Sequence, residues 1–226
     1  MNIVGLQKLT LLDYPGKVAC TVFIGGCNMR CPFCHNSNLI ATAEPSAMQF
    51  EDFFSFLESR QNLLSGVCIS GGEPTLSDGL IEFARRIKQL GYSIKLDTNG
   101  SNPDRLGEMI KSGLLDYVAM DIKSSRENYT KAAGCEIKIA KIEQSIALLL
   151  ESDIEYEFRT TLVRELHIEE DIIAIGEWIR GAKKFTLQNF QPSSNVLRKN
   201  LTGFSESELK NFASILRNYV NEVTVK

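Results

Sequence analysis

Apolar, β-branched runs alternate with amphipathic helical patterns along most of this chain, and this alternation constrains the fold more than any other feature. The apolar runs predict six strands, at residues 18–26, 67–70, 92–97, 116–121, 154–163 and 184–190. Apolar residues at spacings of three and four predict helices at residues 51–64, 78–91, 102–113, 138–152 and 169–181. A further helix from Ser205 onward and a short last strand at 222–226 complete the pattern. Strict alternation of this kind favours right-handed βαβ units and a parallel sheet.

Six βα units are too few for a closed eight-stranded barrel. They fit either an open, doubly wound sheet or an incomplete, curved barrel, and periodicity does not choose between the two. The sequence contains no repeat, linker or low-complexity tract, so we expect residues 1–226 to form a single domain. Both architectures bind ligands at the carboxyl ends of the strands, and the residues directly after each strand are therefore the candidate site.

The composition excludes several classes of function. The chain has 226 residues, of which 43% are hydrophobic and 23% charged, with a formal net charge of -3. This is an ordinary globular composition without the bulk positive charge that favours nucleic-acid binding. No apolar stretch approaches the roughly 20 residues that span a bilayer, and the first residues do not resemble a signal peptide. The sequence thus predicts a cytoplasmic protein that binds neither nucleic acid nor a membrane.

Three of the six cysteines, Cys27, Cys31 and Cys34, stand within eight positions in a C-x3-C-x2-C spacing. Such crowding indicates metal binding rather than disulfides. A structural zinc site usually has four protein ligands, whereas an iron–sulfur cluster can be held by three thiolates with one iron left open. In the zinc alternative His35 would be the fourth ligand, but it directly follows Cys34 and would have difficulty reaching the same ion. The spacing therefore favours an iron–sulfur cluster.

Polar motifs follow three further predicted strands. SGGEPTL ends the strand at 67–70, LDTNG ends the strand at 92–97, and MDIK ends the strand at 116–121. Each alone could be a tight turn or a strand-end cap, but together with the cysteines they mark four strand ends in order. The candidate ligand-binding residues in these motifs are Gly71, Gly72, Glu73, Asp97, Asn99, Asp121 and Lys123.

The cysteine motif has an aromatic residue, Phe33, before its last cysteine, and in this form it resembles the cluster loop of the radical S-adenosylmethionine (SAM) superfamily. The resemblance implies a [4Fe-4S] cluster on Cys27, Cys31 and Cys34, which would be the catalytic residues and the metal ligands. It also implies SAM as second cofactor, cleaved to a 5'-deoxyadenosyl radical, with Phe33 and the backbone beside His35 near adenine. The implied fold is α/β, an incomplete (β/α)6 TIM-like barrel of parallel strands.

The strand-end motifs extend this resemblance. The GGE sequence at 71–73 resembles the motif that binds the amino group of SAM in that superfamily. DTNG and DIK resemble strand ends of glycyl-radical-enzyme activases, which implies that Asp97 and Asp121 bind the ribose hydroxyls. Lys123 would then contact the SAM carboxylate or a neighbouring acid, and Asn99 would shape its loop. Gln191 stands where some activases have a histidine against adenine, so the sequence departs from the pattern there.

The opening GLQKLTLLDYPGKV and the sequence CPFCHN resemble the activating proteins of anaerobic ribonucleoside-triphosphate reductase, and slightly less those of pyruvate formate-lyase. This resemblance implies hydrogen abstraction from a glycine of a partner enzyme, with flavodoxin or ferredoxin as electron donor. We expect one cluster, with Cys20 and Cys68 as buried small side chains and His167 as a structural residue. Two alternatives stay open: a small-molecule radical SAM enzyme such as 7-carboxy-7-deazaguanine synthase, and a zinc-stabilised binding module.

Overall fold

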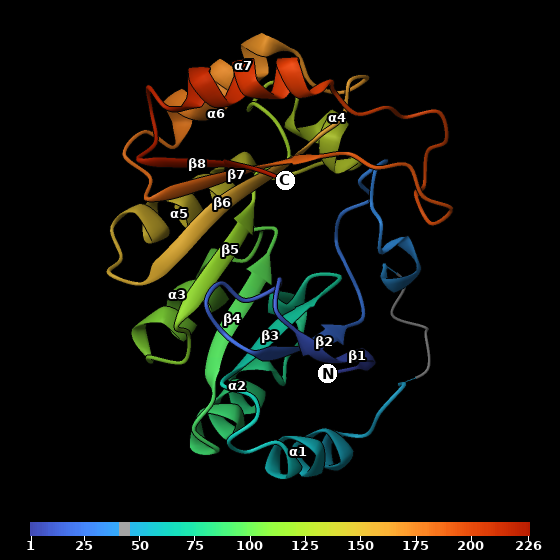
Figure 1. The fold of residues 1–226 in the computed structure, drawn as a ribbon, viewed down its shortest axis with the longest axis vertical. Helices are drawn as coiled ribbons and strands as arrows, with labels where there is room; N and C mark the ends of the chain where they lie inside the picture. The colour runs from blue at the N-terminus through green and yellow to red at the C-terminus, as the bar shows by residue number, and fades with distance from the viewer. Residues whose placement is uncertain (41–45) are drawn as a thin grey trace. The chain divides into compact units, whose positions relative to one another are not determined.

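The computed structural model describes residues 1–40 and 46–226, and within them it contains eight strands, seven α-helices and two short 3-10 helices (Figure 1). The strands are β1 (Ile3–Thr10), β2 (Ala19–Ile24), β3 (Gly66–Gly71), β4 (Ser93–Thr98), β5 (Tyr117–Asp121), β6 (Glu155–Leu162), β7 (Lys184–Asn189) and β8 (Glu222–Val225). The helices are α1 (Phe50–Ser59), α2 (Leu80–Gln89), α3 (Pro103–Lys111), α4 (Tyr129–Ala133), α5 (Ile139–Leu150), α6 (Glu169–Trp178) and α7 (Glu206–Leu216), with 3-10 helices at Ser37–Leu39 and Pro74–Leu76. All seven predicted strands, the short last one included, and all six predicted helices are present.

The chain packs into two compact units, which we describe separately. The first consists of Met1–Asn28, Asn38–Thr98 and Asp104–Val118, apart from residues 41–45, and the second of Met29–Ser37, Asn99–Pro103 and Ala119–Lys226. Strand β5 begins in the first unit and ends in the second.

The sheet of the first unit is mainly parallel. Strands β2, β3 and β4 pair in parallel, with Ile24 opposite Gly71 at the carboxyl ends of β2 and β3. The start of β5 lies beside β4, because the N–H of Asp116 donates to the carbonyl oxygen of Ile94 at 2.9 Å. Helices α1 and α2 pack through fully buried rings of Phe53 and Phe83, whose centroids are 5.1 Å apart.

Strand β1 was not predicted, and it pairs with β2 in the antiparallel direction. It therefore adds an antiparallel strand to the parallel strands that were predicted. Gln7, Lys8 and Leu9 are consecutive exposed residues near its end, so its sequence lacks the alternation of a half-buried strand. The segment is a strand because it pairs with β2, and local periodicity does not report such pairing.

The second unit is a parallel sheet with helices packed on it. Strands β6, β7 and β8 pair in parallel, and the N–H of Ile122 donates to the carbonyl oxygen of Arg159 at 2.8 Å, which sets the end of β5 beside β6. Helices α6 and α7 lie next to each other over the strands β7 and β8 (Figure 1). The single-turn helix α4 was not predicted, because five residues are too few to show a helical period.

Two further predictions can be compared with the fold. None of the cysteines in the described residues forms a disulfide, as the metal-binding interpretation requires, and Cys20 and Cys68 are fully buried as expected. Within residues 1–40 and 46–226, no helix is both long and apolar enough to cross a membrane.

Candidate functional site

In the first unit the GGE turn packs directly on the start of the cysteine loop, which we define as residues 25–36. Gly71 ends β3 with a φ of +124°, and the N–H groups of Gly72 and Glu73 donate to the carbonyl oxygens of Ile24 and Gly26, both at 2.8 Å. A Cβ on Gly72 would lie 2.2 Å from the oxygen of Gly26, which leaves no room for any side chain. These glycines therefore allow the turn to approach the chain's own backbone closely.

Glu73 is buried and holds the turn together. Its Oε1 accepts hydrogen bonds from the N–H of Thr75 at 3.1 Å, the hydroxyl of Thr75 at 2.5 Å and the hydroxyl of Thr98 at 2.8 Å. Because Thr98 belongs to β4, this carboxylate ties the ends of two adjacent strands. Its expected contact with an amino group stays a prediction.

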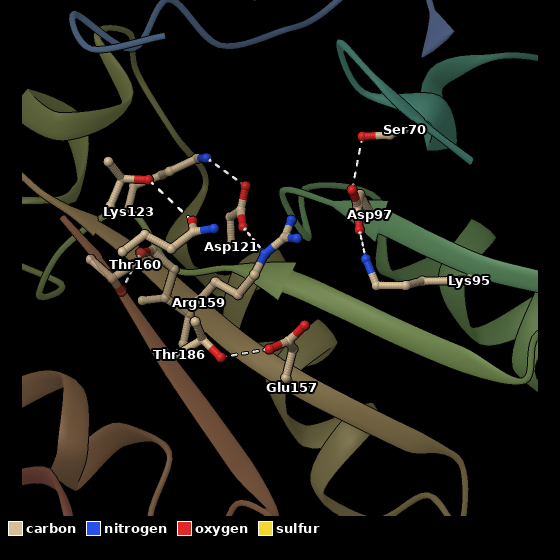
Figure 2. Close-up of polar contacts among 12 residues, drawn as sticks. Ser70, Lys95, Asp97, Asp121, Lys123, Glu157, Arg159, Thr160 and Thr186 are labelled. Carbon is tan, nitrogen blue, oxygen red and sulfur yellow. Dashed lines mark hydrogen bonds and ion pairs between the residues drawn. The ribbon is translucent and has the colours of Figure 1, made fainter. Parts of the chain in front are cut away.

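A buried charge group lies on β3 and β4 of the first unit, and we call Ser70, Lys95 and Asp97 the first strand-end group (Figure 2). The Lys95 ammonium donates to Asp97 Oδ1, and the Ser70 hydroxyl donates to Asp97 Oδ2 at 2.8 Å. Lys95 is 2% exposed and Asp97 is 18% exposed in their side chains. The thiol of Cys68 lies 3.8 Å from both Lys95 Nζ and Asp97 Oδ2, so this buried thiol has polar rather than purely apolar neighbours.

Cys27 belongs to the first unit, where backbone hydrogen bonds to residues 39 and 40 hold this part of the chain. Its N–H donates to the carbonyl oxygen of Ile40 at 3.1 Å, and the N–H of Gly26 donates to that of Leu39 at 2.8 Å. Two successive bonds of this kind fix the backbone that carries the Cys27 thiol.

The rest of the cysteine loop belongs to the second unit and bonds to distant segments there. The N–H of Arg30 donates to the carbonyl oxygen of Ala133 at 2.9 Å, and the N–H of Arg198 donates to that of Pro32 at the same distance. Phe33 is buried and meets the ring of His167 edge-on, with centroids 6.4 Å apart. The loop therefore has a defined course between α4 and the segment after β7.

His35 lies against the segment after β7 in the second unit. Its Nε2 is 2.9 Å from the carbonyl oxygen of Gln191, and its ring centroid is 5.5 Å from that of Phe190. The His35 side chain thus contacts the backbone of Gln191, so these two predicted site residues lie together. An adenine contact for the Gln191 side chain stays a prediction.

The second strand-end group, Asp121, Lys123 and Arg159, lies at the ends of β5 and β6 (Figure 2). Lys123 Nζ donates to Asp121 Oδ2 at 3.1 Å, and Arg159 Nε donates to Asp121 Oδ1 at 2.8 Å. Burial would lower the pKa of Lys123, but the nearby charges of Asp121 and Cys31 outweigh it and raise this pKa. The ammonium is therefore charged, and the three side chains bring two cations and one carboxylate together.

His167 is buried and fixes the backbone of Lys123. Its Nδ1 accepts the N–H of Val163 at 3.0 Å, which leaves Nε2 as the donor to the carbonyl oxygen of Lys123 at 2.8 Å. Burial lowers the pKa of His167, so the neutral ring that this pattern requires is favoured. The residue has the supporting role that the sequence suggested.

The side chain of Asn99 makes a hydrogen bond within its own loop. Its Oδ1 accepts the N–H of Ser101 at 2.9 Å, a local turn that shapes the segment after β4. This agrees with the expectation that Asn99 forms the loop, while any ligand contact stays a prediction.

Three charged residues in or near these groups were not predicted as candidate site residues: Lys95, Glu157 and Arg159. Lys95 shares a strand face with Asp97, and Glu157 shares one with Arg159, as the period of two along a strand would have indicated. Glu157 is buried and accepts the hydroxyl of Thr186 at 2.6 Å (Figure 2). Only the alignment of β5 with β6 explains the contact of Arg159 with Asp121.

The thiols of the second unit are compatible with an iron–sulfur cluster. Burial raises the pKa of Cys34, while the ammonium of Lys123 opposes this effect, so a cation acts on the thiol that must ionise to bind iron. The same unit contains a fully buried hydroxyl, that of Tyr129, without a hydrogen-bond partner in the described residues. Thiols, a nearby cation and an unsatisfied donor suit a negatively charged sulfur ligand set better than a neutral one.

Comparison with known proteins places these features in context. The family model described as the radical SAM superfamily matches residues 21–178. A protein of Methanocaldococcus jannaschii provisionally named a glycyl-radical enzyme activating enzyme is 35% identical over 230 residues, covering 98% of this chain and 94% of its own. The pyruvate formate-lyase-activating enzyme of Listeria monocytogenes is 33% identical over 128 residues, covering 52% of this chain and 51% of its own.

Solved structures show the same fold at low sequence identity. A structure of TYW1 with a lysine-pyruvate adduct is 17% identical, covers 88% of this chain and 73% of its own, and has a TM-score of 0.63. Streptococcus suis SuiB bound to S-adenosylmethionine is 14% identical, covers 91% of this chain and 51% of its own, and has a TM-score of 0.66.

These comparisons confirm the predicted fold class, an α/β domain with the partial barrel of the radical SAM core. They also confirm the predicted cofactors, because the [4Fe-4S] cluster and SAM are those of the family. With the match covering most of the chain, this protein belongs to the radical SAM superfamily and is a radical SAM enzyme.

Proposed function

We propose that residues 1–226 form a single radical SAM domain that activates a partner enzyme by generating a glycyl radical on it. The observation that carries this proposal is the 35% identity to the Methanocaldococcus jannaschii protein, which extends over 98% of this chain and 94% of the relative. A likeness of that extent continues on both sides of the family match at residues 21–178. A protein substrate is therefore favoured over a small molecule.

The partner that we propose is anaerobic ribonucleoside-triphosphate reductase. The opening GLQKLTLLDYPGKV and the CPFCHN sequence support this choice. Pyruvate formate-lyase is the second candidate, supported by the 33% identity to the Listeria monocytogenes activating enzyme over about half of the chain. We propose flavodoxin or ferredoxin as electron donor, because low-potential iron–sulfur chemistry needs a low-potential reductant.

Cys27, Cys31 and Cys34 are the proposed ligands of the [4Fe-4S] cluster. When bound and reduced, the cluster with SAM supplies a 5'-deoxyadenosyl radical that takes a hydrogen atom from the α-carbon of the partner's glycine. The protein's own task is to supply three thiolates and to hold SAM in one orientation. Phe33 and the backbone of His35, next to the last two cysteines, would cover the adenine.

The charge groups have the properties that binding SAM requires. The second strand-end group includes two cations, which suit the SAM carboxylate, and Lys123 is the donor that we assign to it. Asp97 and Asp121 are assigned to the ribose hydroxyls, and Glu73 with the backbone of Gly71 and Gly72 to the amino group. Asn99 shapes the intervening loop, and Gln191 is assigned to the adenine end.

Anaerobic reconstitution with each partner enzyme tests the proposal. The protein, iron, sulfide, SAM and dithionite would be mixed with anaerobic ribonucleoside-triphosphate reductase or with pyruvate formate-lyase, and the glycyl radical measured by electron paramagnetic resonance. We expect a radical on the reductase together with stoichiometric 5'-deoxyadenosine, and none on a reductase variant whose radical glycine is alanine. A radical on pyruvate formate-lyase alone would identify the second candidate. Deoxyadenosine formation that neither partner accelerates would contradict an activating role.

Two cysteine variants provide the matched control. Cys31→Ala should lose the iron–sulfur cluster and SAM cleavage completely, while circular dichroism shows that the fold is retained. Cys20→Ala removes a thiol whose pKa burial raises to about 12, and it should bind a full complement of iron. A Cys31→Ala protein with a full cluster would refute the proposed ligand set.

A further inference from the structure

The sheet of the second unit has a polar face on β6 and β7, which consists of Glu157, Arg159, Thr161, Thr186 and Gln188. Side chains alternate along a strand, so the three residues of β6 point to the same side. Hydrogen bonds join the two strands on this side. The Thr186 hydroxyl donates to Glu157 Oε2 at 2.6 Å, and the Thr161 hydroxyl donates to Gln188 Oε1 at 3.4 Å. A face of this composition suits a polar ligand better than an apolar core.

Glu157 is a buried carboxylate with a single, neutral partner. The residue is 3% exposed, and its Oε2 accepts the Thr186 hydroxyl. Its Oε1 has no hydrogen-bond partner within residues 1–40 and 46–226. Buried carboxylates are usually paired with a cation, because an uncompensated charge in the interior is costly. Oε1 is therefore available to a group that the described part of the chain does not supply.

The two cations on the same side of these strands have other carboxylates as partners. Arg159 Nε donates to Asp121 Oδ1 at 2.8 Å, and its side chain points toward that residue (Figure 2). Lys184, two residues before Thr186 on β7, pairs with Glu222 of β8 at 2.9 Å. Neither forms an ion pair with Glu157 in the described residues. The second unit thus does not match the charge of Glu157 with a cation.

The position of Glu157 indicates which ligand would meet it. It stands two residues before Arg159 on the same face, so their backbones are about 7 Å apart along the strand. Arg159 belongs to the second strand-end group, to which we assign part of SAM. A group bound at Glu157 would therefore be a neighbour of SAM in this unit. The substrate must approach SAM closely to lose a hydrogen atom, so the substrate is the ligand that fits this place.

The chemistry of the carboxylate indicates what the substrate brings. A neutral N–H group would satisfy Oε1 but would leave the negative charge uncompensated. A guanidinium or ammonium group would do both, and its hydrogen bonds to a carboxylate are charge-assisted and strong. In a protein substrate these groups belong to arginine and lysine. A basic side chain is therefore the best complement to Glu157.

We propose that Glu157 recognises a basic side chain close to the glycine that the partner enzyme presents for hydrogen abstraction. Glu157 is thereby a specificity-determining residue, and the Thr186 hydroxyl holds its carboxylate in place. The inference rests on the proposed function, because it takes a segment of a partner enzyme as the substrate.

Peptide binding tests the inference. The reconstituted protein with SAM and without reductant would be titrated into fluorescein-labelled octapeptides that have a central glycine and one arginine at successive positions around it. Matching peptides would contain citrulline, which has nearly the shape of arginine without its charge. We expect at least one arginine peptide to bind about tenfold more tightly than its citrulline counterpart, measured by fluorescence anisotropy. Equal affinities in every pair, or no binding of any peptide, would overturn the inference.

Glu157→Gln assigns the preference to one side chain. It removes the charge and keeps an oxygen that can accept the Thr186 hydroxyl, so the two peptides of each pair should bind equally. Glu165→Gln is the matched control, because Glu165 Oε1 also accepts a threonine hydroxyl, that of Thr202 at 2.7 Å, but lies beyond the end of β6. This control should keep the preference for arginine. The same preference in Glu157→Gln would contradict the assignment.

Stability separates recognition from a structural role. Because no cation of the described chain pairs with Glu157, the Glu157→Gln protein should be at least as stable as the wild type in urea. A marked loss of stability would overturn the inference, since it would show that the chain itself needs this charge.

The partner enzyme gives a last readout. In glycyl radical formation, Glu157→Gln should raise the KM for the partner enzyme about tenfold with little change in kcat, as expected for lost substrate binding. An unchanged KM would overturn the inference. A wild type that forms no glycyl radical on either partner enzyme would instead refute the proposed function, so the two failures are distinguishable.

Discussion

The two strand-end groups both place a carboxylate at the end of a parallel strand, but they differ in charge and burial. In the first, Asp97 pairs with the cation Lys95 and with the neutral hydroxyl of Ser70. In the second, Asp121 pairs with two cations, Lys123 and Arg159. The Lys95 side chain is 2% exposed, whereas the two cations of the second group are each 15% exposed and Asp121 is 30% exposed.

We therefore interpret the first group as a structural ion pair and the second as a candidate ligand-binding group. A buried pair with balanced charge has little electrostatic need for a further ion, and its cation cannot leave its partner without a large desolvation cost. A group that includes two cations, each with part of its side chain exposed, can contact an anion at a smaller desolvation cost. The second group is therefore the better candidate for an anionic part of a ligand, and the first for neutral hydroxyl donors.

Asp97→Asn gives the largest expected effect. It removes the negative charge that pairs with the buried ammonium of Lys95, and we expect the free energy of unfolding to fall by about 3–5 kcal/mol. Urea denaturation of the metal-free protein measures this loss. Combining it with Lys95→Met should restore more than half of the lost stability, and a double variant less stable than Asp97→Asn would contradict the pairing.

Asp121→Asn should cost less, about 2 kcal/mol, because the two cations that it leaves are within reach of water. The same urea experiment applies. The comparison itself fails if this substitution is as destabilising as Asp97→Asn, since the two groups would then be equally dependent on their carboxylates.

Lys123→Met tests whether the second group binds the carboxylate of SAM. We expect SAM to bind about tenfold more weakly, about 1.4 kcal/mol, because one charge-assisted hydrogen bond to its carboxylate is lost. Calorimetric titration of the reconstituted protein measures this change. Arg126→Gln, which removes a cation paired with Glu143 at the exposed surface, is the control and should leave the SAM affinity unchanged. Equal weakening in both variants would indicate a general charge effect.

His167 gives the smallest expected effect, a pH dependence of stability. Its pKa in the folded protein is below the ordinary value of 6.5, so the unfolded chain binds more protons than the folded one under acidic conditions. The stabilisation from the neutral ring is thus complete above pH 6.5 and is lost as the pH falls through the folded pKa. At pH 6 the loss should be below about 1 kcal/mol. Replacing His167 by Gln should remove this component, and an unchanged pH profile would exclude it.

Much of the fold could be predicted because it follows from local patterns. The six parallel strands and their helices have clear periodicity, and the cysteine spacing alone predicts a metal-binding loop. Strand β1 and helix α4 could not be predicted, because one pairs through its neighbour and the other is a single turn. The contact of Asp121 with Lys123 agrees with the period of two along a strand, which sets both side chains on one face.

By itself the sequence determined which residues end each strand, which of them share a face, and that three thiols stand in one loop. Only the tertiary structure decided which charges meet, since the contact of Arg159 with Asp121 depends on the alignment of β5 with β6. It also decided that Tyr129 is buried with an unused donor proton, and that Lys95 is enclosed rather than solvated. The physical reason is that periodicity fixes the direction of a side chain along its own strand or helix, while burial and charge pairing depend on segments remote in sequence.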